Sequence, residues 1–169
     1  MRYWISTSLP VREVRRRAML YFAHAPHEMA LIAREPSRLL FTASLGDLTV
    51  EMEAGRPGRV SVVTTHWHAE GQAFLAEHGE PVDGVIHYET AAARPPLEVL
   101  RLAREHLGRG PEGLGLDVTV EEPGRLEFTG GGGRVAVHAW MDGQPRVHVA
   151  AKRWIYPAEQ FVRQVSAER

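Results

Sequence analysis

The sequence has no cysteine and no asparagine, and its only lysine is Lys152. Without cysteine the chain forms no disulfide and has no thiolate for catalysis or metal binding. Scarcity of cysteine and asparagine is typical of heat-adapted, thermophile proteins, although genome composition explains the arginine bias equally well. No apolar run approaches the roughly 20 residues that span a membrane, and the N-terminus has no secretory apolar stretch. We therefore expect a cytoplasmic protein with no membrane partner.

The chain also lacks an excess of charge of either sign. Its 169 residues carry a formal net charge of −1, with 44% apolar and 24% charged residues. This composition is ordinary for a globular domain with a sizeable core. A dedicated nucleic-acid binder usually has a basic excess, because neutralised phosphates supply most of its affinity. Nucleic acid is therefore an unlikely partner on composition alone.

The sequence repeats itself after 87 residues. Residues 35–76 align with 122–163 without a gap, and 13 of the 42 aligned positions are identical. Two stretches show this directly: "EPSRLLFT" begins at Glu35 and "EPGRLEFT" begins at Glu122. Average composition would give roughly 2 or 3 identities by chance. We infer an internal duplication, with repeat one at 1–80 and repeat two at 81–169 as pseudo-symmetric halves of one unit.

Each repeat has the same pattern of predicted elements. An alternating strand comes first, as in "RYWISTSL" and "GVIHYET", and an amphipathic helix follows it. Four short alternating segments come next, separated by turn signals such as "EPG", "GGGG" and "MDGQP". A second helix closes each repeat. The prediction is an α+β fold of two tandem β-α-β-β-β-β-α repeats that form one antiparallel sheet with helices on one face.

This order of elements resembles the saddle fold of the TATA-box-binding protein family. The resemblance covers the whole chain but is topological, because no sequence motif of that family is present. It implies a pseudo-twofold, one continuous sheet and helices on its convex side. The same topology underlies ligand-binding relatives such as the helix-grip fold, so the resemblance alone carries little about function.

Strand alternation predicts which side chains lie under the helices. The apolar set is expected there: Leu39, Phe41, Leu48, Val50, Met52, Val60, Val62, Leu126, Phe128, Val135, Val137, Ala139, Val147 and Val149. A mixed polar set is expected on the open face of the sheet: Ser6, Arg38, Thr42, Thr49, Glu51, Glu53, Ser61, Thr65, Arg125, Glu127, Thr129, His138, His148 and Lys152.

By the same alternation all four tryptophans, Trp4, Trp67, Trp140 and Trp154, fall on the open face. Large aromatic side chains on a polar face are typical of a contact surface. Packing that is common to both repeats is the alternative explanation for Trp67 and Trp154, because they align with each other. The predicted ligand-binding residues are the open-face group Trp67, Trp140, Trp154, Glu51, Arg38 and Arg125.

The predicted open face does not favour nucleic acid. In the TATA-box-binding protein family the concave face of the sheet binds the minor groove of DNA and inserts phenylalanines between bases. Here Phe41 and Phe128 are predicted to point to the other face. Three carboxylates, Glu51, Glu53 and Glu127, would oppose a polyanion. The arginine-rich first helix could attract phosphate, but such a run is more typical of a solvated helix face.

One polar cluster in repeat two could hold a divalent metal or perform acid–base chemistry. The "MDGQP" turn would place His138 opposite His148, and the glycine turn would bring Glu127 alongside. Ordinary cross-strand polar pairs are the alternative. The positions equivalent to this cluster in repeat one hold Leu40, Glu51 and Ser61, so such a site would belong to one repeat only.

Three functions follow from these patterns. The first is a non-enzymatic binding module that holds a small amphipathic ligand, a peptide or a second copy of the chain on its tryptophan-bearing face. The second is a metal-dependent or acid–base enzyme that uses Glu127, His138 and His148. The third is a nucleic-acid binder.

Overall fold

The computed structural model describes residues 1–24, 26–111 and 113–167, and the chain divides into two compact units. Unit 1 is Met1–Ile86, and unit 2 is the chain from His87 onward. Each unit combines helices with antiparallel strands, so the predicted α+β class is confirmed. Within the described ranges no helix is both long and apolar enough to cross a membrane.

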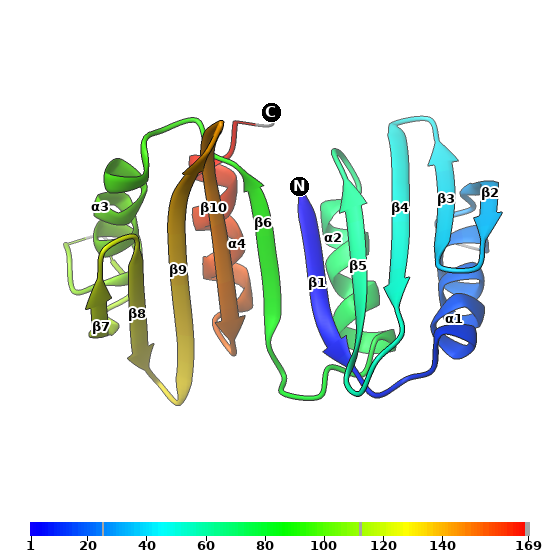
Figure 1. Ribbon diagram of the computed structural model, residues 1–169, viewed down its shortest axis with the longest axis horizontal. Coiled ribbons are helices and arrows are strands. Elements are labelled where there is room, and N and C mark those ends of the chain that lie inside the picture. The colour runs from blue at the N-terminus through cyan, green and yellow to red at the C-terminus, as the bar shows by residue number, and fades with distance from the viewer. Residues whose placement is uncertain (25, 112, 168–169) are drawn as a thin grey trace. The chain divides into compact units, whose positions relative to one another are not determined.

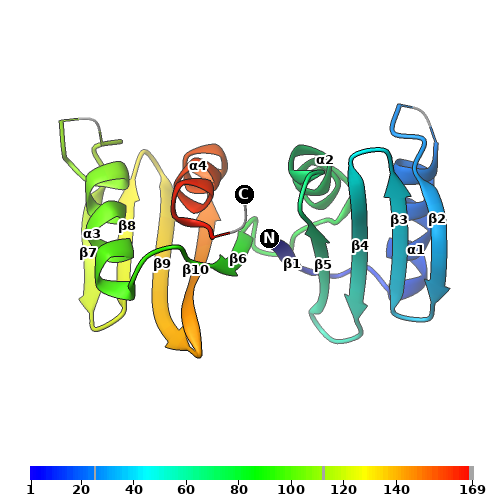
Figure 2. The same cartoon turned by 90° about the horizontal axis from the view of Figure 1, so that it is seen from above.

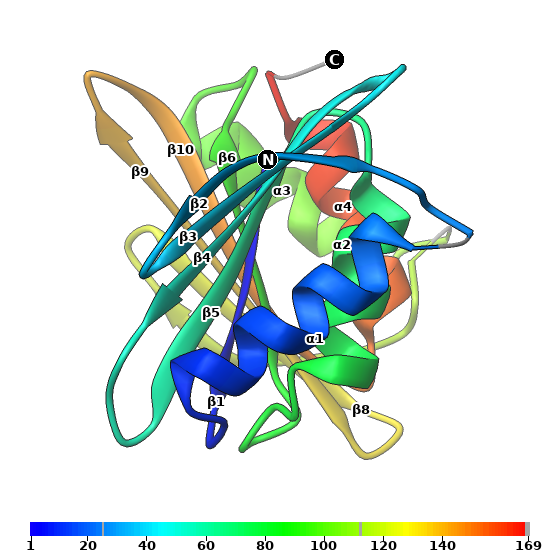
Figure 3. The same cartoon turned by 90° about the vertical axis from the view of Figure 1, so that its right-hand side faces the viewer.

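Unit 1 places its strands in the order β2-β3-β4-β5-β1 (Figure 1). Its strands are β1 (Arg2–Thr7), β2 (Ala30–Glu35), β3 (Arg38–Ala43), β4 (Gly46–Glu53) and β5 (Gly58–Thr64). Its helices are α1 (Val11–Ala23), α2 (His68–Ala73) and the π-helical turn η1 (Phe74–His78). Figure 3 shows α1 and α2 on the same side of β2 to β5, which leaves the other face of these strands free of helices.

Unit 2 has the same element order with a similar strand arrangement, β6-β10-β9-β8-β7. Its strands are β6 (Ile86–Ala91), β7 (Asp117–Glu122), β8 (Arg125–Gly130), β9 (Gly133–Asp142) and β10 (Gln144–Lys152). Its helices are α3 (Pro96–Leu107) and α4 (Ile155–Val165), which both lie on one side of its strands (Figure 2). The face without helices is called the open face of each unit below.

The same irregularity occurs in the outermost strand pair of both units. The register between β2 and β3 shifts between Leu31 and Ala33, and the register between β7 and β8 shifts between Val118 and Val120. These two positions are separated by the spacing of the sequence repeat. A bulge of this kind bends an edge strand and increases its twist. Both units therefore protect their edge in the same way.

The predicted helix-covered residues are all buried, from Leu39 in β3 to Val149 in β10. Val14, Ala18 and Phe22 of α1 pack against them in unit 1, as the helical spacing predicts. Burial of each large aliphatic side chain contributes about 1.5–3 kcal/mol to stability. The alternation of β3–β5 and β8–β10 thus sets both which face is core and which face is open.

Two tyrosines that the sequence patterns did not single out anchor the closing helices. Tyr3 and Tyr88 are fully buried in the first strand of each unit. The Tyr3 hydroxyl lies 2.7 Å from Nδ1 of His68, and the Tyr88 hydroxyl donates a hydrogen bond to the Ile155 carbonyl at 3.1 Å. Each bond reaches the first residue of the closing helix. A buried phenol needs such a partner, because an unpaired hydroxyl in the core is costly.

Candidate functional site

The prediction that Trp67 and Trp154 lie on the open face is wrong, and their common packing role is favoured instead. β5 ends at Thr64 and β10 ends at Lys152, so strand alternation does not extend to either tryptophan. Each residue precedes the closing helix of its unit as its N-cap. The Trp67 indole N–H donates to the Gly46 carbonyl at 3.1 Å, and that of Trp154 donates to Gly130 at 2.8 Å.

The glycine-rich turn of unit 2 is a hairpin turn that fits against Trp154. Gly131 and Gly132 connect β8 to β9 with φ of 56° and 74°, a conformation that favours glycine. A Cβ added at Gly131 would lie 2.7 Å from the Trp154 ring, and one at Gly133 would lie 2.5 Å from it. The run "GGGG" therefore allows close approach of the indole, and it serves the packing of Trp154.

Trp4 and Trp140 do lie on the open faces, but in different surroundings. In unit 1 the Arg59 guanidinium lies 4.1 Å from the centroid of the Trp4 ring, a cation–π contact. In unit 2 Trp140 stacks on His138 of the same strand, with ring centroids 4.9 Å apart. Of the three tryptophans predicted to bind ligand, only Trp140 projects from a strand of an open face.

The open face of unit 1 is occupied by its own polar contacts. Arg38 lies directly opposite Glu51 in the β3–β4 register, and the Glu51 carboxylate forms an ion pair with Arg2 of β1. Ser61, on the other side of Glu51, is buried beside Trp4. The predicted ligand residues Arg38 and Glu51 thus lie opposite each other, and the Glu51 carboxylate is already paired with Arg2.

The three residues predicted to bind metal do not assemble into a metal site. His138 and His148 lie directly opposite each other in the β9–β10 register, as predicted. Glu127 lies opposite Ala136 instead, and its carboxylate forms an ion pair with Arg125. Among the described residues, no group of three or more histidine and carboxylate side chains could hold a metal ion. Arg125, and not Glu127, lies directly opposite His138 in the β8–β9 register.

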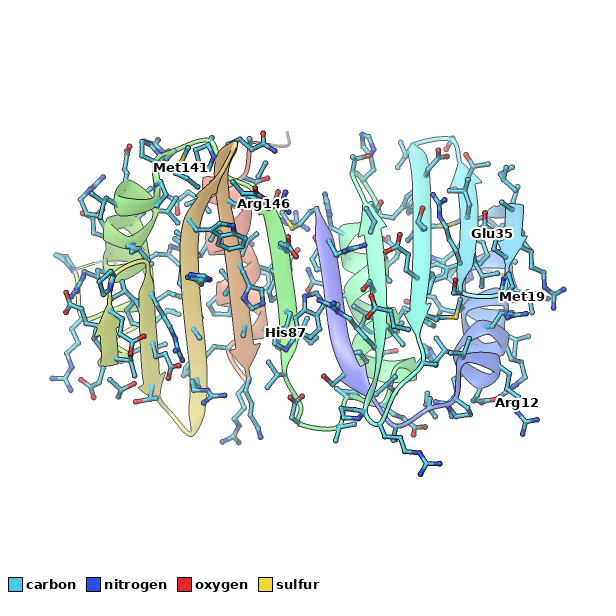
Figure 4. The ribbon with its side chains drawn as sticks, viewed as in Figure 1. Arg12, Met19, Glu35, His87, Met141 and Arg146 are labelled. Atoms are coloured by element: carbon cyan, nitrogen blue, oxygen red, sulfur yellow. The ribbon has the colours of Figure 1, made fainter. Side chains whose placement is uncertain are left out.

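A histidine that the sequence interpretation missed lies beside this pair. Nδ1 of His87 in β6 and Nε2 of His148 in β10 are 3.0 Å apart and share a hydrogen bond, and the two rings are nearly parallel. Figure 4 views unit 2 from its open face and labels His87 together with Arg146, which pairs with Glu89 at 2.5 Å. The alternation of apolar and polar residues in β6, Ile86-His87-Tyr88-Glu89, could have placed His87 on this face. Its closeness to His148 follows from the β6–β10 neighbourhood, which chain order does not reveal.

A hollow of about 580 Å³ opens on this face of unit 2, over β8, β9 and β10. Its floor includes Ala136 and Ala150, which lie directly opposite each other in the β9–β10 register. The polar side chains around the floor are Glu122, Arg125, Glu127, Arg134, His138 and His148. The two facing alanines leave space that larger side chains at the same positions would fill. The hollow has the size of a typical small-molecule site.

The equivalent positions of unit 1 carry larger side chains. Thr49 and Val63 stand where unit 2 has Ala136 and Ala150, and they face each other across β4 and β5. Leu40 stands where unit 2 has Glu127. The smaller side-chain volume at these positions in unit 2 explains why the hollow forms over its strands.

Unit 1 has a different hollow, of about 430 Å³, between α1, the segment after it and η1. Tyr21 is central there, with its ring 4.7 Å from that of His27 and 4.9 Å from that of His78. Burial raises the pKa of Tyr21, and the nearby carboxylates of Glu77 and Glu70 raise it further. The phenol is therefore neutral at physiological pH and available as a hydrogen-bond donor.

No protein-family model matches the chain, and no curated protein sequence matches it. Among solved structures the chain is similar to the crystal structure of DynU16, a protein in the dynemicin biosynthetic locus. The identity is 16%, the match covers 97% of this chain and 93% of DynU16, and the TM-score is 0.36. A likeness at this TM-score carries no argument about the fold or the function of the chain.

Proposed function

We propose that the chain is a binding module that holds a small amphipathic ligand in the hollow on the open face of unit 2. The observation that carries this proposal is the pair of facing alanines, Ala136 and Ala150, with His138 and His148 beside them. The alanine floor offers apolar contact, and the imidazoles and Arg125 offer hydrogen bonds around it. Apolar floors with a few convergent polar groups are typical of small-molecule sites.

Filling the hollow tests this function. The neutral fluorescent probe N-phenyl-1-naphthylamine should bind the wild-type protein saturably and quench Trp140, which neighbours His138. Ala150→Leu places a larger side chain on the floor and should weaken binding about tenfold or more. Val63→Leu places the same leucine at the equivalent position of unit 1 and should leave binding unchanged. Probe binding that survives Ala150→Leu would rule the hollow out.

The second candidate is acid–base chemistry in the same hollow, favoured by the hydrogen bond between His87 and His148. Such a bond holds an imidazole in one orientation, as general acid–base catalysis requires. His148→Gln should then abolish turnover of any substrate found and keep probe binding within a few-fold. Loss of both together would indicate a binding role for His148 instead.

The element order of each unit is the one that the resemblance to the TATA-box-binding protein family implies, and membership of that fold stays a prediction.

Two simple measurements distinguish the remaining alternatives for function. Nucleic-acid binding predicts retention on heparin that falls with salt. Native mass spectrometry of freshly purified protein reports a bound small molecule, a metal ion or a homodimer in one spectrum.

A further inference from the structure

The end of the unit 2 hollow near the glycine turn carries two cations that face each other. Arg134 lines the hollow, and Lys152 lies directly opposite it in the β9–β10 register. Both residues are exposed, and neither forms an ion pair with a residue in the described part of the chain. Like charges directly opposite each other on a sheet destabilise it. An anion bound between Arg134 and Lys152 would reduce this repulsion.

A third cation lies at the same end. Arg153 follows Lys152 with a φ of 68°, and its guanidinium lies against the glycine turn, where Nη1 would be 2.5 Å from a Cβ added at Gly132. The turn leads directly into Gly133 and Arg134 of β9. The local charge is therefore strongly positive, although the chain as a whole carries a net charge of −1.

At the other end of the hollow the arginine is already paired with carboxylates. Arg125 pairs with Glu127 and lies 3.6 Å from the Glu122 carboxylate. An acidic group of a ligand would meet two carboxylates there. The polar contacts of the hollow thus favour one orientation for an acidic ligand, with its acid group toward Arg134 and Lys152.

We propose that Arg134 and Lys152 form an anion subsite, and that the ligand of the unit 2 hollow is a small organic acid. This inference rests on the binding function proposed above. The acid group, a carboxylate, phosphate or sulfonate, lies between the two cations, and the apolar part of the ligand covers Ala136 and Ala150. Arginine and lysine are the side chains that best bind such groups.

The size and charge of the hollow favour a small acid over a nucleic acid. About 580 Å³ accommodates a small molecule, whereas a strand of nucleic acid would extend past Glu122 and Glu127. Unit 1 has no equivalent subsite, because Asp47 and Thr65 occupy the positions of Arg134 and Lys152. The difference gives an internal control within one protein.

Two matched probes test the subsite. The anionic probe 1-anilinonaphthalene-8-sulfonate has the same ring system as N-phenyl-1-naphthylamine and adds one sulfonate. At about pH 8, where imidazoles are ordinarily neutral, the anionic probe should bind about tenfold more tightly or better. Arg134→Gln and Lys152→Gln should each reduce this preference severalfold, because each should weaken binding of the anionic probe more than binding of the neutral one. Arg12→Gln, an exposed arginine of α1 in unit 1 (Figure 4), makes the same change of net charge and should have no effect.

Lys152 offers a second readout, because it is the only lysine. Reductive methylation with ¹³C-formaldehyde labels its ammonium group, while the N-terminal amine is buried against the Thr64 carbonyl. The anionic probe should shift the methyl signal of Lys152, and the neutral probe should leave it in place. This measurement uses the folded wild-type chain and does not depend on the stability of a variant.

The outcomes separate the two proposals. Equal binding of both probes to the wild-type protein would overturn the anion subsite and leave the binding function standing. Failure of both probes to bind would overturn the function, and the subsite with it. A preference that persists in Arg134→Gln and Lys152→Gln would place the acid group elsewhere. Displacement of the anionic probe by a stoichiometric short oligonucleotide would assign the subsite to nucleic acid and overturn the small-acid ligand.

Discussion

The two units share a framework and differ on their open faces. Each buries a tyrosine in its first strand and holds its closing helix with it. Each ties a tryptophan to a hairpin turn through the indole N–H. The buried positions of β3–β5 and β8–β10 carry the same kinds of apolar side chain. These features depend on contacts with the helices, and so they tolerate little change in either unit.

The open faces are under no such restriction, because none of the helices that the structure describes packs on them. Unit 1 places Glu51 and Ser61 where unit 2 places His138 and His148. Asp47 of unit 1 is replaced by Arg134, and Val63 by Ala150. The same strands therefore carry a self-paired polar face in one unit and a hollow with cations in the other. Because unit 1 has the same framework without these residues, the comparison favours unit 2 as the place of the candidate function.

The largest expected effect tests the shared framework. Phe41 and Phe128 are equivalent and fully buried, so Phe41→Ala and Phe128→Ala should each lower the free energy of unfolding by about 3–5 kcal/mol. Urea denaturation followed by circular dichroism measures both. Phe41→Leu and Phe128→Leu keep most of the volume and serve where the alanine variants do not fold.

Thr42→Ala and Thr129→Ala are the controls for this prediction. These threonines lie next to the phenylalanines on the opposite face, and surface substitutions of this kind usually change stability by less than about 0.5 kcal/mol. A large loss for one phenylalanine with almost none for its mate would show that the two cores are not equivalent.

A smaller loss of stability is expected from substitutions in the hairpin turns, and its size should differ between the β8–β9, β9–β10 and β3–β4 turns. Gly131→Ala imposes a positive φ on alanine and brings a Cβ against Trp154, so it should cost more than the ~1–2 kcal/mol that the left-handed conformation alone costs. Gly143→Ala has a φ of 66° with no atom within 4 Å of the added Cβ, and it isolates the conformational cost. Ser44→Ala changes a residue of the β3–β4 turn of unit 1 whose own φ is not positive, and it should be nearly neutral. Thermal unfolding would contradict this order if Gly143→Ala were the most destabilising.

Much of this fold could be predicted from the sequence because its information is local. Alternation over short strands fixed the buried set correctly, and the turn signals fixed the opposition of His138 and His148. The prediction failed where alternation was extended beyond a strand end, as it was to Trp67 and Trp154. β5 ends three residues before Trp67 and β10 ends two residues before Trp154, so the alternation of side chains no longer applies to either tryptophan.

The candidate site was less predictable because it depends on neighbours that are distant in sequence. His87 and His148 are 61 residues apart, and only the β6–β10 neighbourhood brings them together. Glu127 was expected beside the histidines, but Arg125 competes for its carboxylate. The hollow itself arises from what two alanines omit, and a missing side chain leaves no motif in a sequence.

The smallest expected effect lies on α1 of unit 1. Hydrogen bonds from Arg16 and Arg17 lower the pKa of Glu13 from 4.5 to about 2. Because the folded pKa lies below the unfolded value, this carboxylate stabilises the fold above about pH 4.5 and loses its contribution as the pH falls toward about 2. Glu98 is the third residue of α3, as Glu13 is of α1, and it pairs with Arg94 and Arg101.

Glu13→Gln removes this pH-dependent contribution. The variant should be slightly less stable than the wild-type protein near neutral pH, because exposed ion pairs contribute little. The difference between their urea midpoints should shrink as the pH falls below about 4.5 and vanish near 2. Glu35→Gln removes an exposed carboxylate of β2 and corrects for the general effect of losing one negative charge. A difference that grows on acidification would mean that the two arginines do not hold the Glu13 carboxylate in solution.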